Sequence, residues 1–509
     1  GLRADEPYSS GFLKEFDIES LYAALQDVHF PQTLEQARRG RARLVFDELM
    51  VFCRMIELLN EEKTGDSEIR LDIGKKFMGS FVQRLGFAPT GGQLRIMNEI
   101  AGDLAGETYM NRLVQGDVGS GKTAIAFYAM ECMRASGYQS VMMAPTEILA
   151  EQHCNAAKEL FPAGEVACIT GSLKGKGKKV ELEKLRMGEA KIIIGTHALI
   201  YGDVEFDNLG LIITDEQHRF GVKQRAAIAG KGKDVHTLTM SATPIPRSLA
   251  LVLYGKTDIS ILDEMPPGRK EIKTYLIRKR KYGDMIGFIR REMDAGRQVY
   301  MVCPLIEDGK DDELQSATAM FEEVRETYAG TGMALLHGRL KAKEKQEIMQ
   351  GFAAGEIKML VSTTVIEVGV NVPNASVMAV INAERFGLAQ LHQLRGRVGR
   401  GADQAYCFLL SDHTGAFERL KVLADTNNGF EIAEKDMEFR GVGDVFGTRQ
   451  HGKGVLKIAN LVQDMRQLEK ARHVLEILAK NDRFAWEYGG ITQAAKEVMD
   501  SKMLEIALN

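Results

Sequence analysis

The stretch LVQGDVGSGKTAIA, from Leu113 to Ala126, joins an apolar run to a helical pattern through a glycine-rich loop. The loop has the spacing GxxxxGK[ST], and a strand before it with a helix after it is the context that this phosphate-binding motif needs. Glycines let backbone amides close around phosphate oxygens, and the start of a helix favours negative charge. The candidate nucleotide-binding residues of this loop are Gly116, Gly119, Ser120, Gly121, Lys122 and Thr123.

Two residues of the loop have expected chemical roles. Lys122 is expected to reach the β- and γ-phosphates, and the Thr123 hydroxyl is expected to bind Mg²⁺. A small-molecule kinase, a nucleotide-gated switch and one half of a motor could each carry such a loop. The rest of the chain has to decide between these classes.

A pair of carboxylates follows the apolar run LGLIIT, which begins at Leu209. Because the carboxyl ends of parallel strands share one edge of a sheet, Asp215 is expected beside the phosphate loop as a second Mg²⁺ ligand. Glu216 is then the candidate to polarise the attacking water. An ordinary strand end is the alternative, but the position after the phosphate loop favours the catalytic interpretation. His218 is given only a coupling role.

The segment FAPTGGQ precedes the phosphate loop and has two interpretations. The amide of Gln93 could pair with the hydrogen-bonding edge of adenine, and Phe87 could stack on the base. Alternatively, the segment is a loop that caps a helix through Thr90. The sequence leaves both interpretations open.

The segment QLHQLRGRVGR, from Gln390 to Arg400, lies near the end of a second α/β region. A guanidinium suits the oxygens of a transferring phosphoryl group, so Arg397 and Arg400, with Gln393, are the catalytic candidates here. A solvated helix end, or a contact with nucleic-acid phosphate, is the alternative. Because the second region has no phosphate loop of its own, its arginines are expected to complete the site on the first.

Short apolar runs alternate with amphipathic stretches along most of the chain, which predicts an α/β fold with parallel sheets. The alternation stops at EMPPGRK, from Glu264 to Lys270, and then restarts. Two tandem, doubly wound parallel-sheet lobes are therefore expected, between a helical N-terminal segment and a helical C-terminal tail. The expected strands are 111–115, 139–145, 165–170, 191–196, 209–216 and 236–243 in the first lobe, and 271–277, 298–305, 332–338, 357–364, 376–382 and 405–411 in the second.

The ends of the chain raise two further expectations. The helical pattern from Arg41 to Lys63 has an apolar face that another element has to cover. The tail after Gly452 has a matching apolar stripe, and the sequence leaves open whether it packs there. The lysine-rich stretch from Ser172 to Lys184 is expected to be a solvated loop rather than a phosphate contact.

The composition excludes several classes of protein. The chain has 509 residues, 45% of them hydrophobic and 27% charged, and no apolar stretch long enough to span a membrane. Its six cysteines form no CxxC pair, so neither a zinc site nor a disulfide framework is expected, and the usage fits a reducing cytoplasm. The formal net charge of -4 means that any nucleic-acid contact has to come from local patches.

Six segments occur in the order found in superfamily 2 helicases: GDVGSGKT, APTEILAEQH, DEQHRFGV, MSATPIPRSLAL, STTVIEVGVNVPNA and QLRGRVGR. Between Asp27 and Gly452 the chain resembles the RecG family of bacterial ATP-dependent helicases, which remodel branched DNA. Its segments DEQHRFGVKQR and EMPPGRK resemble that family more than the related transcription-repair coupling factor.

The resemblance implies RecA-like lobes, ATP and Mg²⁺ as ligands, and branched or duplex DNA as the partner. It also implies a place in the bacterial cytoplasm at the nucleoid, with single-stranded-DNA-binding protein as a candidate partner and no zinc or membrane. The implied domains are an N-terminal helical segment (1–75), lobe 1 (76–268), lobe 2 (269–420) and a translocation hairpin with the tail (421–509). The chain is expected to begin just after a wedge domain.

Further site residues follow from the resemblance alone. Gly369 is expected at the nucleotide, and residues of two helicase motifs are expected to relay the nucleotide state to DNA. The segment GFEIAEKDMEFRGVGDVFGTRQHG is similar to the family's translocation motif. The coupling and DNA candidates are Ser241, Thr243, Thr364, Glu367, Arg440, Arg449 and Gln450. The alternatives left open are a coupling-factor type of duplex DNA translocase, an RNA helicase and a non-catalytic nucleotide-gated module.

Overall fold

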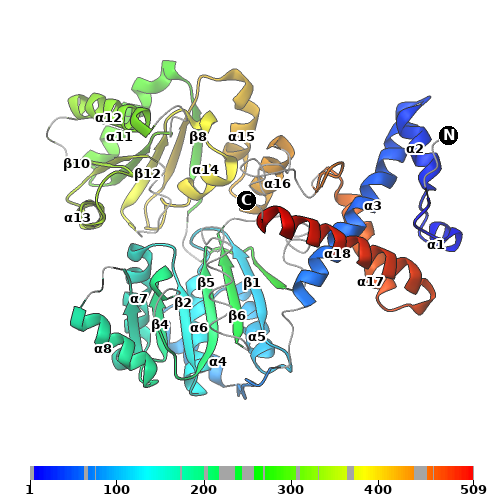
Figure 1. Cartoon of the computed structure of the whole chain (residues 1–509). Helices are drawn as coiled ribbons and strands as arrows, with labels where there is room; N and C mark the ends of the chain where they lie inside the picture. Colours follow the sequence, from blue (N-terminus) through cyan, green and yellow to red (C-terminus); the bar gives the residue numbers. More distant parts are fainter. Residues whose placement is uncertain are drawn as a thin grey trace. The chain divides into compact units, whose positions relative to one another are not determined.

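The computed structural model describes most of the chain, in two units (Figure 1). One is a helical unit of Gly1–Thr64, Ile245–Thr257 and Met437–Asn509, and the other is a two-sheet unit of Gly65–Pro244 and Asp258–Asp436. The described residues are 5–61, 67–74, 76–171, 173, 175–199, 204–216, 235–242, 257–266, 270–304, 310–328, 330, 332–363, 372–440, 456–461 and 463–507.

The first sheet of the two-sheet unit has seven parallel strands in the order β3-β4-β2-β5-β6-β1-β7. Apart from the edge strand β7, these short strands are almost fully buried, as expected for a sheet covered on both faces. Only β6 separates β1 from β5, so the residues that follow β1 and β5 meet at one edge. The strands are β1 (Asn111–Gly116), β2 (Gln139–Met143), β3 (Val166–Ile169), β4 (Ile192–Gly195), β5 (Leu209–Asp215), β6 (His236–Ser241) and β7 (Asp258–Leu262).

Alternate side chains of the first sheet enter two different cores. Ile192 and Ile194 of β4 lie in a core with α5 and α6, whereas Ile193 lies in a core with Leu185 of α8. This is the alternation that a strand imposes on its side chains. The helices of this lobe are α4 (Phe77–Arg84), α5 (Gly91–Leu104), α6 (Lys122–Ala135), α7 (Glu147–Leu160) and α8 (Gly175–Arg186).

The second sheet has six parallel strands in the order β10-β11-β9-β12-β13-β8. One of its cores contains α11 and α12, and the other contains α13, α14 and α15 (Figure 1). The strands are β8 (Lys273–Ile277), β9 (Gln298–Val302), β10 (Met333–Leu336), β11 (Met359–Ser362), β12 (Ala375–Val380) and β13 (Tyr406–Leu410). The helices are α11 (Tyr282–Asp294), α12 (Lys310–Thr327), α13 (Ala342–Ala353), α14 (Leu388–Arg395) and α15 (Phe417–Asp425), and α16 (Gly429–Arg440) follows them.

The helical unit is built around the long helix α3 (Leu34–Glu61), with α1 (Ser10–Glu15) and α2 (Leu21–His29) before it. The apolar face of α3 packs against α17 (Met465–Leu478) and α18 (Ala485–Ala507), so the C-terminal tail does return to this helix. Phe46 and Leu49 of α3 share a core with Leu475 of α17. At the same contact, the Arg41 guanidinium donates two hydrogen bonds to Asp464 at 2.5 and 2.8 Å.

Each of the twelve strands expected from the sequence corresponds to an observed strand, within a few residues at its ends. Strand β7 was not expected. The stretch expected as a loop at Ser172–Lys184 contains most of helix α8, in which Lys184 and Arg186 pair with glutamates three residues earlier. None of the helices in the described ranges is both long and apolar enough to cross a membrane.

No disulfide framework was expected from the cysteine spacing, and the described residues contain one bonded pair. Cys154 of α7 and Cys168 of β3 are bonded to each other, with their Cα atoms 6.1 Å apart. Spacing rules do not find this pair, because the two residues meet only through the packing of α7 on the sheet. The other four cysteines, Cys53, Cys132, Cys303 and Cys407, are free and buried.

Candidate functional site

The phosphate loop turns sharply between β1 and α6, and two of its glycines are needed for the turn. Gly119 and Gly121 have φ values of +81° and +87°, in the left-handed region that favours glycine. A Cβ atom on Gly121 would also lie 2.2 Å from Nε2 of Gln93. The loop therefore keeps its shape only with glycine at position 121.

Gln93 supports this loop from α5. Its Oε1 accepts a hydrogen bond from the Thr90 amide, and the Thr90 hydroxyl accepts one from the Gln93 amide, which forms a capping box. Its Nε2 donates to the Ser120 carbonyl at 2.8 Å. The helix-capping interpretation is thus confirmed, whereas the contact with adenine stays a prediction. Phe87 is half exposed.

Lys122 begins α6, and its side chain lies almost fully buried above the loop. Its Nζ donates to the carbonyl oxygens of Gly116 and Asp117, at 2.6 and 2.9 Å. Burial lowers the pKa of the Lys122 amine. The negative charges of Glu216, Asp215 and Asp117 act in the opposite direction but do not outweigh burial. The amine therefore lies among carboxylates at the point where phosphate oxygens are expected.

Asp215 ends β5, and its carboxylate has a partner that the sequence analysis missed. Nε2 of His153, on α7, lies 3.1 Å from Oδ2 of Asp215, and both side chains are largely buried. A ring held in this way fixes the orientation of the carboxylate. His153 is the last residue of the segment APTEILAEQH, but nothing in that pattern reveals a contact with a residue 62 positions later.

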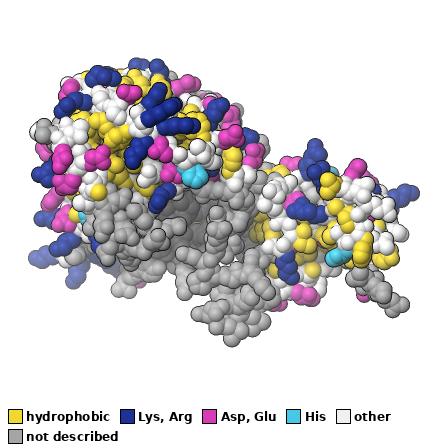
Figure 2. All heavy atoms as spheres, turned by 90° about the horizontal axis from the view of Figure 1, so that it is seen from above, with side chains coloured by type: hydrophobic (Ala, Val, Ile, Leu, Met, Phe, Trp, Pro, Cys, Tyr) yellow, Lys and Arg dark blue, Asp and Glu magenta, His cyan; other side chains and the backbone are white. Residues whose placement is uncertain are grey.

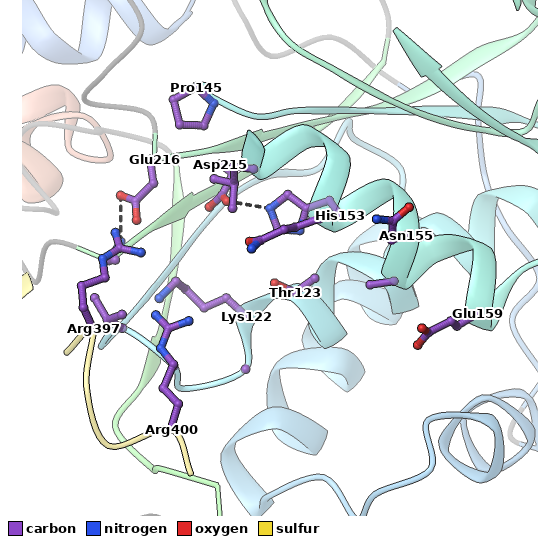
Figure 3. A pocket seen from close by; sticks show the side chains of 17 residues that line it. Lys122, Thr123, Pro145, His153, Asn155, Glu159, Asp215, Glu216, Arg397 and Arg400 are labelled. Carbon is purple, nitrogen blue, oxygen red and sulfur yellow. Dashed lines mark hydrogen bonds and ion pairs between the residues drawn. The ribbon is translucent and has the colours of Figure 1, made fainter. Parts of the chain in front are cut away.

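Glu216 follows Asp215 with a left-handed backbone conformation, at a φ of +54°. Such a φ is uncommon for a residue other than glycine and persists only where the surroundings impose it. One carboxylate oxygen accepts a hydrogen bond from the Ala242 amide at 3.4 Å. Figure 3 shows the Glu216 carboxylate and the Arg397 guanidinium pointing towards each other.

The second lobe contributes two arginines to the same cavity. Arg397 and Arg400 follow α14, whose C-terminal Gly396 lies so near Val118 of the phosphate loop that a Cβ atom there would be 2.9 Å from the Val118 Cβ. In Figure 3 the Arg400 side chain lies beside Lys122, and the charge of Arg400 lowers the pKa of that lysine after the larger effect of burial. Both lobes therefore line one volume.

This cavity has a volume of about 560 Å³. Loop residues, carboxylates and arginines expected from the sequence line it together: Gly119, Gly121, Lys122, Thr123, Asp215, Glu216, Arg397 and Arg400. Gln152, His153, Asn155 and Glu159 of α7 also line it, and none of them was expected from the sequence. Figure 3 shows His153, Asn155 and Glu159 along this helix.

Several predicted residues lie apart from this lining. Gly116, Ser120 and Gln93 form or support the phosphate loop, Gln393 is buried in α14, and Ser241 ends β6. Their predicted roles are not tested by the geometry. Outside the described residues lie His218, Thr243, Thr364, Glu367, Gly369, Arg449 and Gln450. The backbone of Arg440 ends α16, but its side chain is outside the description.

The distribution of charge on the surface indicates a binding site less clearly than the cavity does. Figure 2 shows Lys and Arg side chains mixed with Asp and Glu and with hydrophobic patches on the face that it displays. This mixture agrees with the formal net charge of -4. Any contact with a polyanion on the described part of this face would therefore be made by local groups of basic side chains.

Three family models match the chain. Residues 90–252 match the DEAD/DEAH box helicase family, and residues 280–402 match the helicase conserved C-terminal domain. Residues 426–504 match the C-terminal part of domain 3 of the ATP-dependent DNA helicase RecG.

Similar proteins agree with these matches. The ATP-dependent DNA helicase RecG of Bacillus subtilis (strain 168) is 43% identical over 98% of this chain and 74% of its own length. The protein of the same name from Staphylococcus aureus (strain MSSA476) is 46% identical, over 90% of this chain and 68% of its own length. A solved structure described as RecG bound to a three-way DNA junction superposes with a TM-score of 0.74 at 41% identity, over 92% of this chain but 62% of that one. The chain belongs to the family of ATP-dependent DNA helicases called RecG.

Proposed function

We propose that this chain is an ATP-driven DNA helicase that remodels branched DNA, such as forks and junctions, in recombination and repair. The observation that carries the proposal is the cavity beside the phosphate loop, to which both lobes contribute catalytic candidates. Lys122 and Asp215 come from the first lobe, and Arg397 and Arg400 come from the second. A site divided in this way makes hydrolysis depend on the arrangement of the two lobes.

The side chains in the cavity fit the steps of ATP hydrolysis. The loop amides and Lys122 hold the phosphates, Glu216 orients the attacking water, and Arg397 and Arg400 stabilise the charge that develops in the transition state. Gln93 and Phe87 are assigned to adenine. Gln393 and Gly369 are proposed to act beside these groups, and resemblance to the family supports this.

The residues of the cavity also fit Mg²⁺. The Thr123 hydroxyl and the Asp215 carboxylate both line it, and Mg²⁺ prefers oxygen ligands of these kinds. His153 holds the carboxylate in one orientation. When bound, the ion would neutralise charge on the phosphate oxygens.

Branched DNA as the substrate is supported by a relative. The protein bound to a three-way DNA junction is 41% identical to this chain, although the chain spans only 62% of its length. Contacts to phosphate would position the duplex without reading its sequence. The coupling roles of Ser241, Thr243, Thr364, Glu367, Arg440, Arg449 and Gln450 are part of the proposal, as is the division into 1–75, 76–268, 269–420 and 421–509.

The cellular setting is proposed on family membership alone. The named relatives are bacterial, which supports a place at the nucleoid of a bacterial cell. Single-stranded-DNA-binding protein is the proposed partner there. Binding of that protein to the purified chain, measured by titration calorimetry, would test this part separately.

The test of the main proposal is steady-state ATP hydrolysis at one fixed salt concentration, because phosphate contacts weaken steeply with salt. One reaction contains no nucleic acid. The others each contain one kind: single-stranded DNA, duplex DNA, a synthetic fork or structured RNA. Stimulation by duplex or forked DNA above RNA is expected, with Lys122→Ala as the inactive control. Stronger stimulation by RNA would indicate an RNA helicase, and turnover equal to that of the control would indicate a non-catalytic module.

A further inference from the structure

Asp117 lines a cavity other than the nucleotide cavity. Asp117 belongs to the phosphate loop, yet it lines a second cavity of about 360 Å³ instead of the cavity that holds Lys122 and Thr123. His392, Asn428 and Glu264 are among the other residues around this second volume. The Asp117 carboxylate therefore has a role other than contact with phosphate.

The Asp117 carboxylate joins α14, which lies between β12 and β13, to α16, which follows the second sheet. Its Oδ1 lies 3.0 Å from Nε2 of His392 in α14, and its Oδ2 accepts a hydrogen bond from the Gly429 amide at 3.2 Å. Gly429 is the first residue of α16. Burial alone would raise the pKa of Asp117, but the bonds to His392 and Gly429, with the charge of Lys122, lower it. The group is therefore a carboxylate that bridges two donors.

The direction of the bond to His392 follows from a third residue. Nη2 of Arg395 lies 2.9 Å from Nδ1 of His392, and a guanidinium can only donate. Nδ1 must then be the acceptor, so Nε2 carries the proton and its N–H donates a hydrogen bond to Asp117. Arg395 is itself fixed, because its Nη1 donates to the carbonyl oxygens of Leu423 and Thr426, at 2.6 and 3.0 Å.

The approach of α16 to this pair requires glycine. A Cβ atom on Gly429 would lie 1.9 Å from Oδ1 of Asp117 and 2.7 Å from Nε2 of His392. The same helix is held to α14 about two turns further on, where Asp436 accepts from the Leu388 amide at 3.3 Å and the Ala389 amide at 3.4 Å. The start of α16 is thus docked on the phosphate loop and on α14 together.

We propose that Asp117 is a positioning residue that couples the phosphate loop to α16 by holding His392 and the Gly429 amide at the same time. The inference rests on the proposed function and adds a route by which the state of the nucleotide reaches the C-terminal segment. When the loop moves on nucleotide binding, the carboxylate has to carry both donors with it or lose a buried hydrogen bond. The start of α16 therefore follows the loop.

Three variants remove this contact from three different elements. Asp117→Asn keeps the shape but has one acceptor oxygen, so its NH₂ group has to face either the His392 N–H or the Gly429 N–H. His392→Phe removes the donor, and Gly429→Ala forces the helix away. Gly287→Ala in α11, where a Cβ atom would meet nothing within 4 Å, and the exposed Asp294→Asn are matched controls.

The experiment measures ATP hydrolysis on duplex DNA and, in the same reaction, displacement of a third strand by translocation. We expect displacement to be at least tenfold slower in all three variants, and hydrolysis to stay within about threefold of wild type in His392→Phe and Gly429→Ala, whose residues lie outside the phosphate loop. His392→Gln, whose amide can still donate to Asp117, is expected to recover most of the displacement. The double variant Asp117→Asn with Gly429→Ala is expected to displace the third strand as fast as Asp117→Asn alone. Both substitutions break the same contact, between Asp117 and the start of α16, so their effects do not add.

A second readout does not depend on turnover. Hydrogen exchange of the backbone amides 429–436 is expected to change in wild type when a non-hydrolysable ATP analogue is added, and to stay unchanged in Asp117→Asn. Equal losses of hydrolysis and displacement in Asp117→Asn would overturn the inference and assign the residue to the ATP site. Displacement at the level of the controls would overturn it as well. Wild-type hydrolysis that no DNA stimulates would instead refute the proposed function, and this inference with it.

Discussion

Glu216 shows how much of the site depends on a single residue. Its left-handed backbone has a cost of order 1–3 kcal/mol for a residue with a side chain, which the ordered end of β5 has to offset. The strained conformation turns the chain directly after Asp215, so that two consecutive carboxylates both line the cavity. An extended strand would have placed them on opposite faces.

We expect Glu216→Gln to keep nucleotide affinity while turnover falls by about 10²-fold or more. The amide preserves the shape and the bond from Ala242, but it removes the charge that polarises water. Binding of a fluorescent ATP analogue and single-turnover hydrolysis separate the two effects. Loss of binding in this variant would mean that Glu216 holds the nucleotide and does not orient water.

Gly121 provides a second test at a single position. We expect Gly121→Ala to weaken nucleotide binding at least tenfold, because the new methyl group combines an unfavourable φ with a clash against Gln93. Gly102→Ala, in the last turn of α5 with open space around it, is the matched control. The control is expected to stabilise the protein by about 0.5–1 kcal/mol, measured by denaturant unfolding. Equal nucleotide affinity in the two variants would refute the steric argument.

At the scale of elements, the sequence predicted what is local and missed what depends on packing. Most strands of both sheets contain a short apolar run, so they could be recognised one at a time. Strand β7 is a short edge strand, exposed at Asp258, and its pairing with β1 decides its conformation. His153 could not be assigned for the same reason, since its partner Asp215 is brought to it by the packing of α7.

The pairing of α3 with α17 can be tested within the helical unit. Leu475 of α17 is fully buried in the core that it shares with Phe46 and Leu49. We expect Leu475→Ala to lower the free energy of unfolding by about 2–5 kcal/mol, because it leaves a cavity at a helix contact. His473→Ala, at an exposed position of the same helix, is the control and is expected to change stability by less than about 0.5 kcal/mol. Thermal unfolding of both variants distinguishes a structural helix pair from a loose contact.

At the scale of the molecule, the two-sheet unit holds an incomplete site in each lobe. The first lobe supplies the phosphate loop and both carboxylates, and the second supplies arginines without a phosphate loop of its own. The close approach of Gly396 to Val118 and the bridge from Asp117 to His392 join the lobes directly beside the loop. Turnover and the arrangement of the lobes are therefore expected to depend on each other.

Arg397→Ala tests this dependence. We expect DNA-stimulated turnover to fall by about 10³-fold, in the range typical of an arginine supplied from another domain, while nucleotide affinity changes by only a few fold. Arg385→Ala, at an exposed position of the same lobe, is the control and is expected to behave as wild type. Equilibrium binding and hydrolysis with and without duplex DNA distinguish the possible outcomes. If Arg397→Ala weakens nucleotide binding and turnover by the same factor, the arginine contributes to binding of ATP and not specifically to the transition state. Stabilisation of the transition state then has to come from Arg400 or from the first lobe alone.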